Sequence, residues 1–116
     1  MTDNLDYNTA SDSVRIAYQW LSAQEPISRC TRVYRPLKHI IEAWGGRYVS
    51  QDDVSTAARM LGIQGTYPCF DISARLVWPN EERLSDIREA LTMLNYRESY
   101  KPENTYARTE GTYYYD

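Results

Sequence analysis

The sequence predicts a small, mainly α-helical domain with a small β component, and three observations support this fold class. Apolar residues recur at helical spacing in four segments, which begin near residues 12, 36, 50 and 81. Serine, asparagine, proline or glycine stands at the ends of these segments, where such residues begin or stop helices. The last residues have strand character around a glycine, which indicates a C-terminal β-hairpin.

The chain has 116 residues, a length typical of one domain, and 42% of them are hydrophobic, which is typical of a globular protein. The first ten residues are mostly polar and carry no helical stripe. We therefore expect residues 1–10 to form a flexible N-terminus. Residues 11–116 are expected to form a single helical domain with a C-terminal hairpin.

The first two helices are predicted over residues 12–23 and 36–44. Ser11 or Asp12 caps the first of them, and a proline three residues past its end stops it. The second begins with a proline, whose fixed φ suits a first helical turn. Its apolar stripe consists of Leu37, Ile40, Ile41 and Trp44. The glycine pair 45–46 stops it, because glycine readily takes the left-handed conformation.

Two further helices are predicted over residues 50–61 and 81–94. Ser50 caps the third helix and Asn80 the fourth. The stripe of the fourth helix consists of Leu84, Ile87, Leu91 and Leu94. Between them, apolar and polar residues alternate over 70–78, which favours a strand; a short helix that begins at Asp71 is the alternative.

The predicted hairpin joins residues 105–108 to residues 112–115, with Gly111 supplying the positive φ of a tight turn. It is rich in tyrosine, of which the chain has 11 against one phenylalanine. Tyrosine is frequent at protein interfaces, so we interpret part of this cluster as a partner-binding surface. Its residues are Tyr106, Tyr113, Tyr114 and Tyr115. The alternative is that these rings cover a small core.

The order of these elements resembles that of a winged helix, in which one helix enters the major groove and a hairpin touches the flanking backbone. Helix 81–94 with the hairpin as the wing is one placement, and helix 50–61 with a helix near 70–77 is the other. The resemblance is one of element order only. It implies a winged-helix-like bundle of about four helices with a C-terminal hairpin.

Charge is distributed unevenly along the chain, whose net charge is −3. Residues 26–49 contain five basic residues and one acidic residue, a net charge of +4, whereas helix 81–94 is net acidic. Arginine and lysine near an aromatic residue are typical of a phosphate-binding surface. The candidate nucleic-acid-binding residues are Arg29, Arg32, Tyr34, Arg35, Lys38, Arg47 and Arg108. The alternative is a basic face that pairs with acidic regions of the same chain.

No group of residues predicts catalysis, a metal site or a cofactor. The soft ligands are Cys30, Cys69 and His39, too few for a zinc site, and one histidine without a nearby nucleophile does not indicate an active site. The sequence shows no signal peptide and no apolar run long enough for a membrane span. We therefore expect a cytoplasmic protein with free thiols, while a disulfide remains the alternative.

Two functions follow as hypotheses. The first is a small DNA-binding or regulatory protein of winged-helix type, in the style of a phage or plasmid regulator, that uses residues 29–47 and the hairpin. The second is a non-enzymatic inhibitor or adaptor that binds a protein partner through its tyrosine-rich hairpin and its acidic surface. That acidic surface consists of Glu81, Glu82, Asp86 and Glu89. Duplex DNA, another protein or a second copy of the chain is the expected partner.

Overall fold

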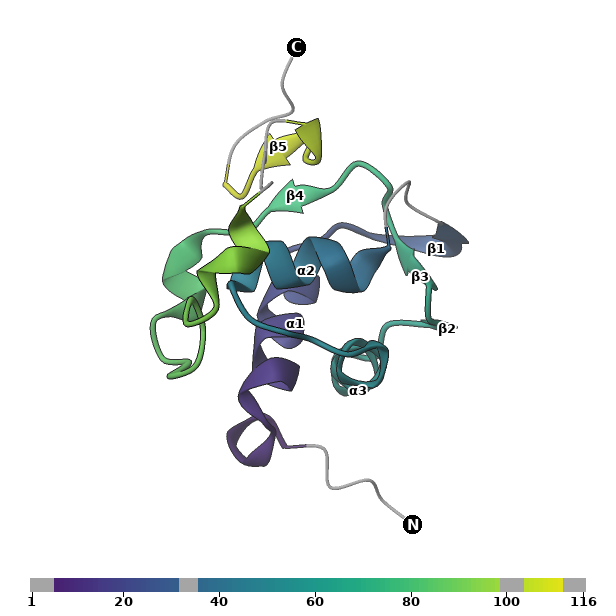
Figure 1. Ribbon diagram of the computed structural model, residues 1–116. Helices are drawn as coiled ribbons and strands as arrows, with labels where there is room; N and C mark the ends of the chain where they lie inside the picture. Colours follow the sequence, from purple (N-terminus) through teal and green to yellow (C-terminus); the bar gives the residue numbers. More distant parts are fainter. Residues whose placement is uncertain (1–5, 32–35, 99–103, 112–116) are drawn as a thin grey trace.

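The computed structural model of the protein describes residues 6–31, 36–98 and 104–111 and shows a mixed α/β fold (Figure 1). Within these residues there are three α-helices, α1 (Asp12–Ser22), α2 (Leu37–Gly45) and α3 (Gln51–Leu61). Short 3-10 helices accompany them, among them η1 (Tyr7–Thr9), η2 (Glu81–Leu84) and η3 (Leu94–Arg97). The strands are β1 (Pro26–Thr31), β2 (Gly65–Thr66), β3 (Cys69–Ile72), β4 (Val77–Trp78) and β5 (Arg108–Thr109).

The strands form two small sheets at different places on the helical core (Figure 1). β3 lies between β1 and β2 and is antiparallel to both. β4 and β5 form a separate parallel pair. The prediction of a four-helix, winged-helix-like bundle with a C-terminal hairpin is therefore wrong: the described chain is a three-helix core with two separate sheets.

The first three predicted helices are confirmed, with most of the local signals at their ends; Pro36, predicted in the first turn of the second helix, instead precedes α2 as its N-cap residue. The Ser11 side chain accepts the backbone N–H of Val14 at the start of α1. Ser50 and Asp53 form a reciprocal capping box at the start of α3. Gly46 ends α2 in the left-handed conformation, with φ of 61°.

The core lies where the three helices meet, and its largest members are the fully buried Trp20, Trp44 and Phe70. The close approach of α2 to α1 depends on Gly45, because a Cβ at this position would lie 2.5 Å from Cγ2 of Ile16. Gly45 therefore serves packing, in addition to the helix stop that the sequence predicted for the pair 45–46.

The predicted helix 81–94 is not formed. Asn80 does cap a helical turn, since its side chain accepts the N–H of Glu82, but the turn ends as η2 at Leu84. Leu91 has a positive φ of 62°, which a right-handed helix cannot include. Leu84 and Ile87 are buried as the stripe requires, whereas Leu91 and Leu94 are exposed. Two turns, η2 and η3, replace the predicted helix.

The predicted hairpin is also corrected. β5 pairs in parallel with β4, a strand some thirty residues earlier, and the N–H of Glu110 donates to the carbonyl of Trp78 at 2.8 Å. Gly111 has the predicted positive φ, of 86°. The second predicted strand, 112–115, lies outside the described residues.

The segment 70–78, in which the alternation of apolar and polar residues favours a strand, is extended at both of its ends. β3 and β4 occupy residues 69–72 and 77–78 of the predicted 70–78 segment, with a bend at residues 74–75. After α1 the chain forms β1, which begins at Pro26.

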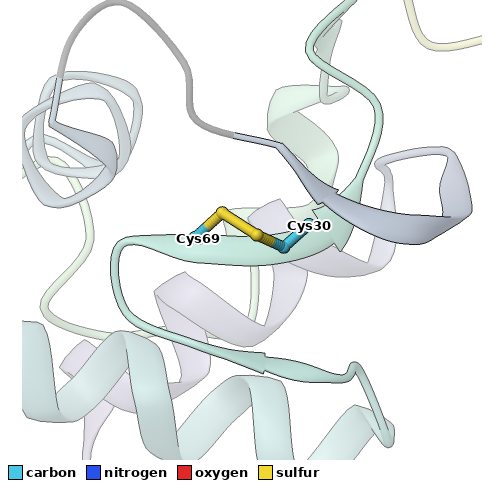
Figure 2. The surroundings of a disulfide bond; sticks show 2 residues. All are labelled: Cys30 and Cys69. Carbon is cyan, nitrogen blue, oxygen red and sulfur yellow. A yellow bond between two sulfur atoms is a disulfide. The ribbon is translucent and has the colours of Figure 1, made fainter.

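A disulfide joins Cys30 of β1 to Cys69 of β3, in place of the free thiols that we expected (Figure 2). The two sulfur atoms link residues 39 positions apart in the sequence. The ladder between β1 and β3 is irregular, with a register shift between Pro26 and Thr31. The disulfide thus fixes a strand pair that has few regular ladder positions.

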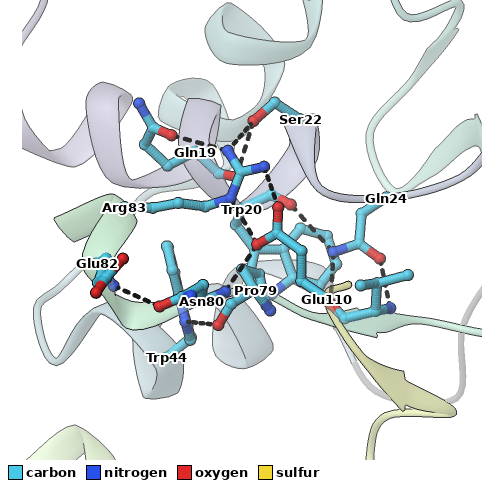
Figure 3. Close-up of polar contacts among 11 residues, drawn as sticks. Gln19, Trp20, Ser22, Gln24, Trp44, Pro79, Asn80, Glu82, Arg83 and Glu110 are labelled. Atoms are coloured by element: carbon cyan, nitrogen blue, oxygen red, sulfur yellow. Dashed lines mark hydrogen bonds and ion pairs between the residues drawn. The ribbon is translucent and has the colours of Figure 1, made fainter. Parts of the chain in front are cut away.

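Arg83 and Glu110 tie the C-terminal part of the described chain to α1 (Figure 3). Nε of Arg83 lies 2.8 Å from Oε1 of Glu110, and Nη1 donates to Gln19 and Ser22 at 3.0 and 2.8 Å. The backbone N–H of Asn80 donates to the same carboxylate at 2.8 Å. The hydrogen bond from Arg83, with a smaller contribution from Asn80, lowers the pKa of Glu110.

We expect this pair to make stability depend on pH. A carboxyl group whose pKa is lowered by folding stabilises the fold above its ordinary pKa of 4.5, and this contribution is lost as pH falls through the lowered value. Urea unfolding should show Glu110→Gln to be less stable than the native chain at pH 7. The difference should shrink well below pH 4.5, where the native Glu110 is also neutral. A difference that is constant with pH would contradict this role.

Candidate interaction surface

The C-terminal end of α2 is capped by a segment that lies far away in the sequence. The last carbonyl groups of a helix lack partners within it. The carbonyl of Gly45 accepts the N–H of Leu91 at 2.7 Å, and that of Gly46 accepts the N–H of Met93 at 2.8 Å. The backbone of residues 91–93 is therefore fixed against the end of α2.

Arg97 completes this cap from η3. Its Nε donates to the carbonyl of Ala43 at 3.0 Å, and Nη2 donates to the carbonyl of Trp44. A cation at a helix C-terminus also interacts favourably with the helix dipole. Nη1 reaches Oε2 of Glu81 at 3.3 Å, which brings the two ends of segment 81–97 together. The segment thus closes on itself while it covers the end of α2.

Among the residues that the structure describes, Leu91 is the non-glycine residue whose backbone is left-handed, with a positive φ. Such a position favours glycine, and a leucine there costs about 1–3 kcal/mol. Its side chain recovers only part of this cost in the core, because it is 36% exposed. Its Cα lies 2.8 Å from where a Cβ on Gly46 would stand. The conformation at Leu91 is therefore held by the backbone contacts with α2.

Exposed apolar side chains concentrate on this segment. Among the described residues the exposed large hydrophobic side chains are Tyr48 (47%), Leu91 (36%), Met93 (41%) and Leu94 (62%). We call the last three the apolar patch. They lie within four residues of one another, on backbone anchored at Leu91 and Met93. Exposed apolar side chains that lie close together in the chain, on a fixed backbone, are typical of a segment that binds another molecule.

The apolar patch lies in a segment with an acidic surface. Segment 81–98 has five carboxylates against three guanidinium groups. Its exposed charged residues are Glu81, Glu82, Asp86, Arg88, Glu89 and Glu98. The two other arginines, Arg83 and Arg97, are partly buried and paired with Glu110 and Glu81. Apolar side chains combined with polar and charged ones are the usual composition of a protein-binding surface.

The predicted nucleic-acid-binding residues do not form one basic face in the described chain. Arg29 is exposed on β1, whereas the other described members are paired with carboxylates. These pairs are Lys38–Glu42 at 3.0 Å, Arg47–Glu89, and Arg108–Glu25 at 3.0 Å. Arg32, Tyr34 and Arg35 lie outside the described residues. Intrachain ion pairs reduce the positive charge that Lys38, Arg47 and Arg108 offer to a phosphate backbone.

Tyr106 is the described member of the predicted tyrosine surface, and it is buried (5% exposed). Its hydroxyl accepts a hydrogen bond from Nε1 of Trp20 at 2.9 Å, and its ring stacks on Trp78. These contacts match the alternative in which tyrosine covers the core. Tyr113, Tyr114 and Tyr115 lie outside the described residues.

His39 and Glu42 are the titratable pair nearest to a catalytic arrangement. Nδ1 of His39 lies 3.1 Å from Oε1 of Glu42, one helical turn away, and the imidazole is otherwise exposed. Among the residues that the structure describes, no serine or threonine hydroxyl bonds to His39, and no cluster of three or more His, Cys, Asp or Glu side chains suits a metal ion. The sulfur of Cys69 is in the disulfide, so it is not a free nucleophile.

Sequence reasoning missed the apolar patch because it placed Leu91 and Leu94 on the buried stripe of a helix. Nothing local in residues 81–94 signals the break, which results from backbone contacts of Leu91 and Met93 with the distant end of α2 at Gly45 and Gly46. The one usable signal is the acidic charge of the segment, which the sequence did assign to a protein-binding surface.

Comparisons with protein families, with curated proteins and with solved structures find no match for this chain. Among the helices of the described residues, none has the length and apolar character needed to cross a membrane.

Proposed function

We propose that this protein is a non-enzymatic interaction protein that binds a protein partner through the apolar patch of Leu91, Met93 and Leu94. The observation that carries the proposal is that these exposed apolar side chains stand on backbone fixed to the end of α2. A fixed backbone lowers the entropy that must be lost on binding. The left-handed Leu91 adds to it, since strained positions cluster at binding sites.

DNA binding, the other hypothesis from the sequence, stays a prediction, but it loses its architectural support with the winged helix. The pairing of Lys38, Arg47 and Arg108 with carboxylates favours the protein partner over the phosphate backbone.

As for the compartment, the disulfide favours an oxidising setting over the reducing cytoplasm, where disulfides are rare.

The test uses the double variant Leu91→Gly/Leu94→Ser. Glycine suits the left-handed backbone, so the loss of leucine contacts and the relief of strain offset each other. We expect its free energy of unfolding to stay within about 1 kcal/mol of the native value, as measured with urea. We expect its affinity for the partner to fall at least about tenfold, because central apolar contacts dominate interface energies.

The partner is captured with the tagged, full-length chain from a nuclease-treated lysate of its source cells, and the affinities are measured by titration. Tyr48→Ser is the matched control, since Tyr48 is an exposed apolar residue outside the segment, beside Lys38. A stoichiometric protein that binds native chain and control but not the double variant supports the proposal. No such protein, or equal loss in the control, overturns it.

A further inference from the structure

We infer that the apolar patch binds a cationic amphipathic segment of its partner, one that carries apolar anchors beside lysine or arginine. The inference rests on the proposed function and adds the chemistry of the partner. It follows from which charged side chains of segment 81–98 are paired within the chain and which are not.

Two of the cations near the apolar patch, Arg97 and Arg47, are turned towards the protein itself. Arg97 donates to the carbonyls of Ala43 and Trp44 and pairs with Glu81. Arg47 is largely covered and pairs with Glu89. Each guanidinium is thus held by the fold, and its charge is compensated within the chain.

Three carboxylates of segment 81–98 are not neutralised by these ion pairs. Glu82, Asp86 and Glu98 are exposed, and none of them belongs to the ion pairs of the described residues. Arg88 is the exposed arginine of the segment, and it too has no ion pair among the described residues. Three carboxylates against one guanidinium give this surface a net charge of −2 before any partner binds.

This charge discriminates between classes of occupant. A nucleic acid or an anionic lipid surface would bring negative charge against Glu82, Asp86 and Glu98, and a second copy would place like charges together. A cationic amphipathic segment matches both features: its apolar side chains cover Leu91, Met93 and Leu94, and its cations meet the carboxylates. Charge complementarity of this kind mainly raises association rates and selects between partners.

Three designed peptides of equal length test the inference. The first is an amphipathic helix of leucine and lysine, the second has the same leucine face with glutamate in place of lysine, and the third contains the lysines without a leucine face. Binding to the native full-length chain is measured by fluorescence anisotropy at ionic strengths of about 0.05 M and about 0.5 M. We expect the leucine–lysine peptide to bind at least about tenfold more tightly than the other two at low ionic strength.

Two double variants with equal charge changes separate the patch from general acidity. Asp86→Asn/Glu98→Gln removes two carboxylates of the segment, and Asp6→Asn/Asp52→Asn removes two exposed carboxylates elsewhere. Asparagine at position 6 can still accept the capping hydrogen bond that Asp6 accepts from Asn8. We expect the first pair to weaken binding several-fold and the second to leave it within about twofold.

The outcomes distinguish this inference from the proposed function. Binding of the leucine–lysine peptide that weakens with salt, with Leu91→Gly/Leu94→Ser and with Asp86→Asn/Glu98→Gln supports it. Equal binding of the leucine–glutamate peptide, no patch-dependent binding, or a patch-dependent dimer in sedimentation velocity overturns it. If the lysate partner is nevertheless lost with Leu91→Gly/Leu94→Ser, the proposed function stands while this inference fails. If no patch-dependent lysate partner exists, the proposed function itself fails.

Discussion

Replacing both cysteines with serine is expected to lower the free energy of unfolding by about 2–4 kcal/mol. The disulfide spans a sequence separation of 39 residues, and a cross-link over a loop of this length strongly restricts the unfolded chain. The β1–β3 ladder is itself irregular, since it shifts register between Pro26 and Thr31. Cys30 is exposed, so serine at this position adds little burial cost of its own.

Urea unfolding followed by circular dichroism measures this effect, with and without dithiothreitol. The native chain with dithiothreitol should match Cys30→Ser/Cys69→Ser, and the variant should not respond to the reductant. Because the effect lies mainly in the unfolded chain, the variant should keep the native helical signal at low urea. A native chain that is equally stable in both conditions would show that the disulfide contributes nothing to stability.

The helices that the sequence predicted well are those whose ends are determined locally. Ser11 and Ser50 cap helices with their own side chains, and Gly46 and Gly62 end helices in the left-handed conformation. These signals act within a few residues, so a single sequence contains them in full. The buried stripe of α2 follows from the same local periodicity.

The elements that the sequence did not predict are determined by distant contacts. Residues 81–94 carry a helical stripe and a good cap, yet the N–H of Leu91 donates to the carbonyl of Gly45 rather than to a helical partner. β5 pairs with β4 in parallel across some thirty residues, whereas a local hairpin signal favours an antiparallel neighbour. No pattern within either segment contains this information.

Of the candidate surface, too, one part could be predicted from the sequence and another part could not. The acidic character of residues 81–89 is visible in the sequence, because charge needs no fold to be counted. The exposure of Leu91 and Leu94 is not visible in the sequence, because it requires the predicted helix 81–94 to be interrupted. Burial of Tyr106 and the pairing of Arg108 with Glu25 likewise depend on where the C-terminal segment docks.

The second large effect is expected at Glu42, a carboxylate that is 2% exposed. Its Oε2 accepts hydrogen bonds from Nζ of Lys38 at 3.0 Å and from the backbone N–H of Val49 at 3.1 Å, while Oε1 faces His39. Glu42→Ala leaves the buried N–H of Val49 without its acceptor and Lys38 without its counter-ion. We expect the free energy of unfolding to fall by about 3 kcal/mol.

Helix propensity cannot explain such a loss, because alanine is the best helix former. Glu42→Gln keeps an oxygen for Val49 but not the charge that meets Lys38, so a smaller loss of about 1–2 kcal/mol is expected. Glu98→Ala, at an exposed position, should stay within about 0.5 kcal/mol of the native chain.

Hydrogen exchange at the Val49 amide separates the two contributions of Glu42. The amide should exchange much faster in Glu42→Ala, where no side chain covers its N–H, and should keep most of its protection in Glu42→Gln. If both variants lose protection equally, the charge pair with Lys38 holds the turn between α2 and α3. If Glu42→Ala keeps native stability and native exchange, the buried carboxylate does not hold that turn. Because the same turn begins at Gly46, whose carbonyl accepts the N–H of Met93, its loosening should also reduce exchange protection at Met93.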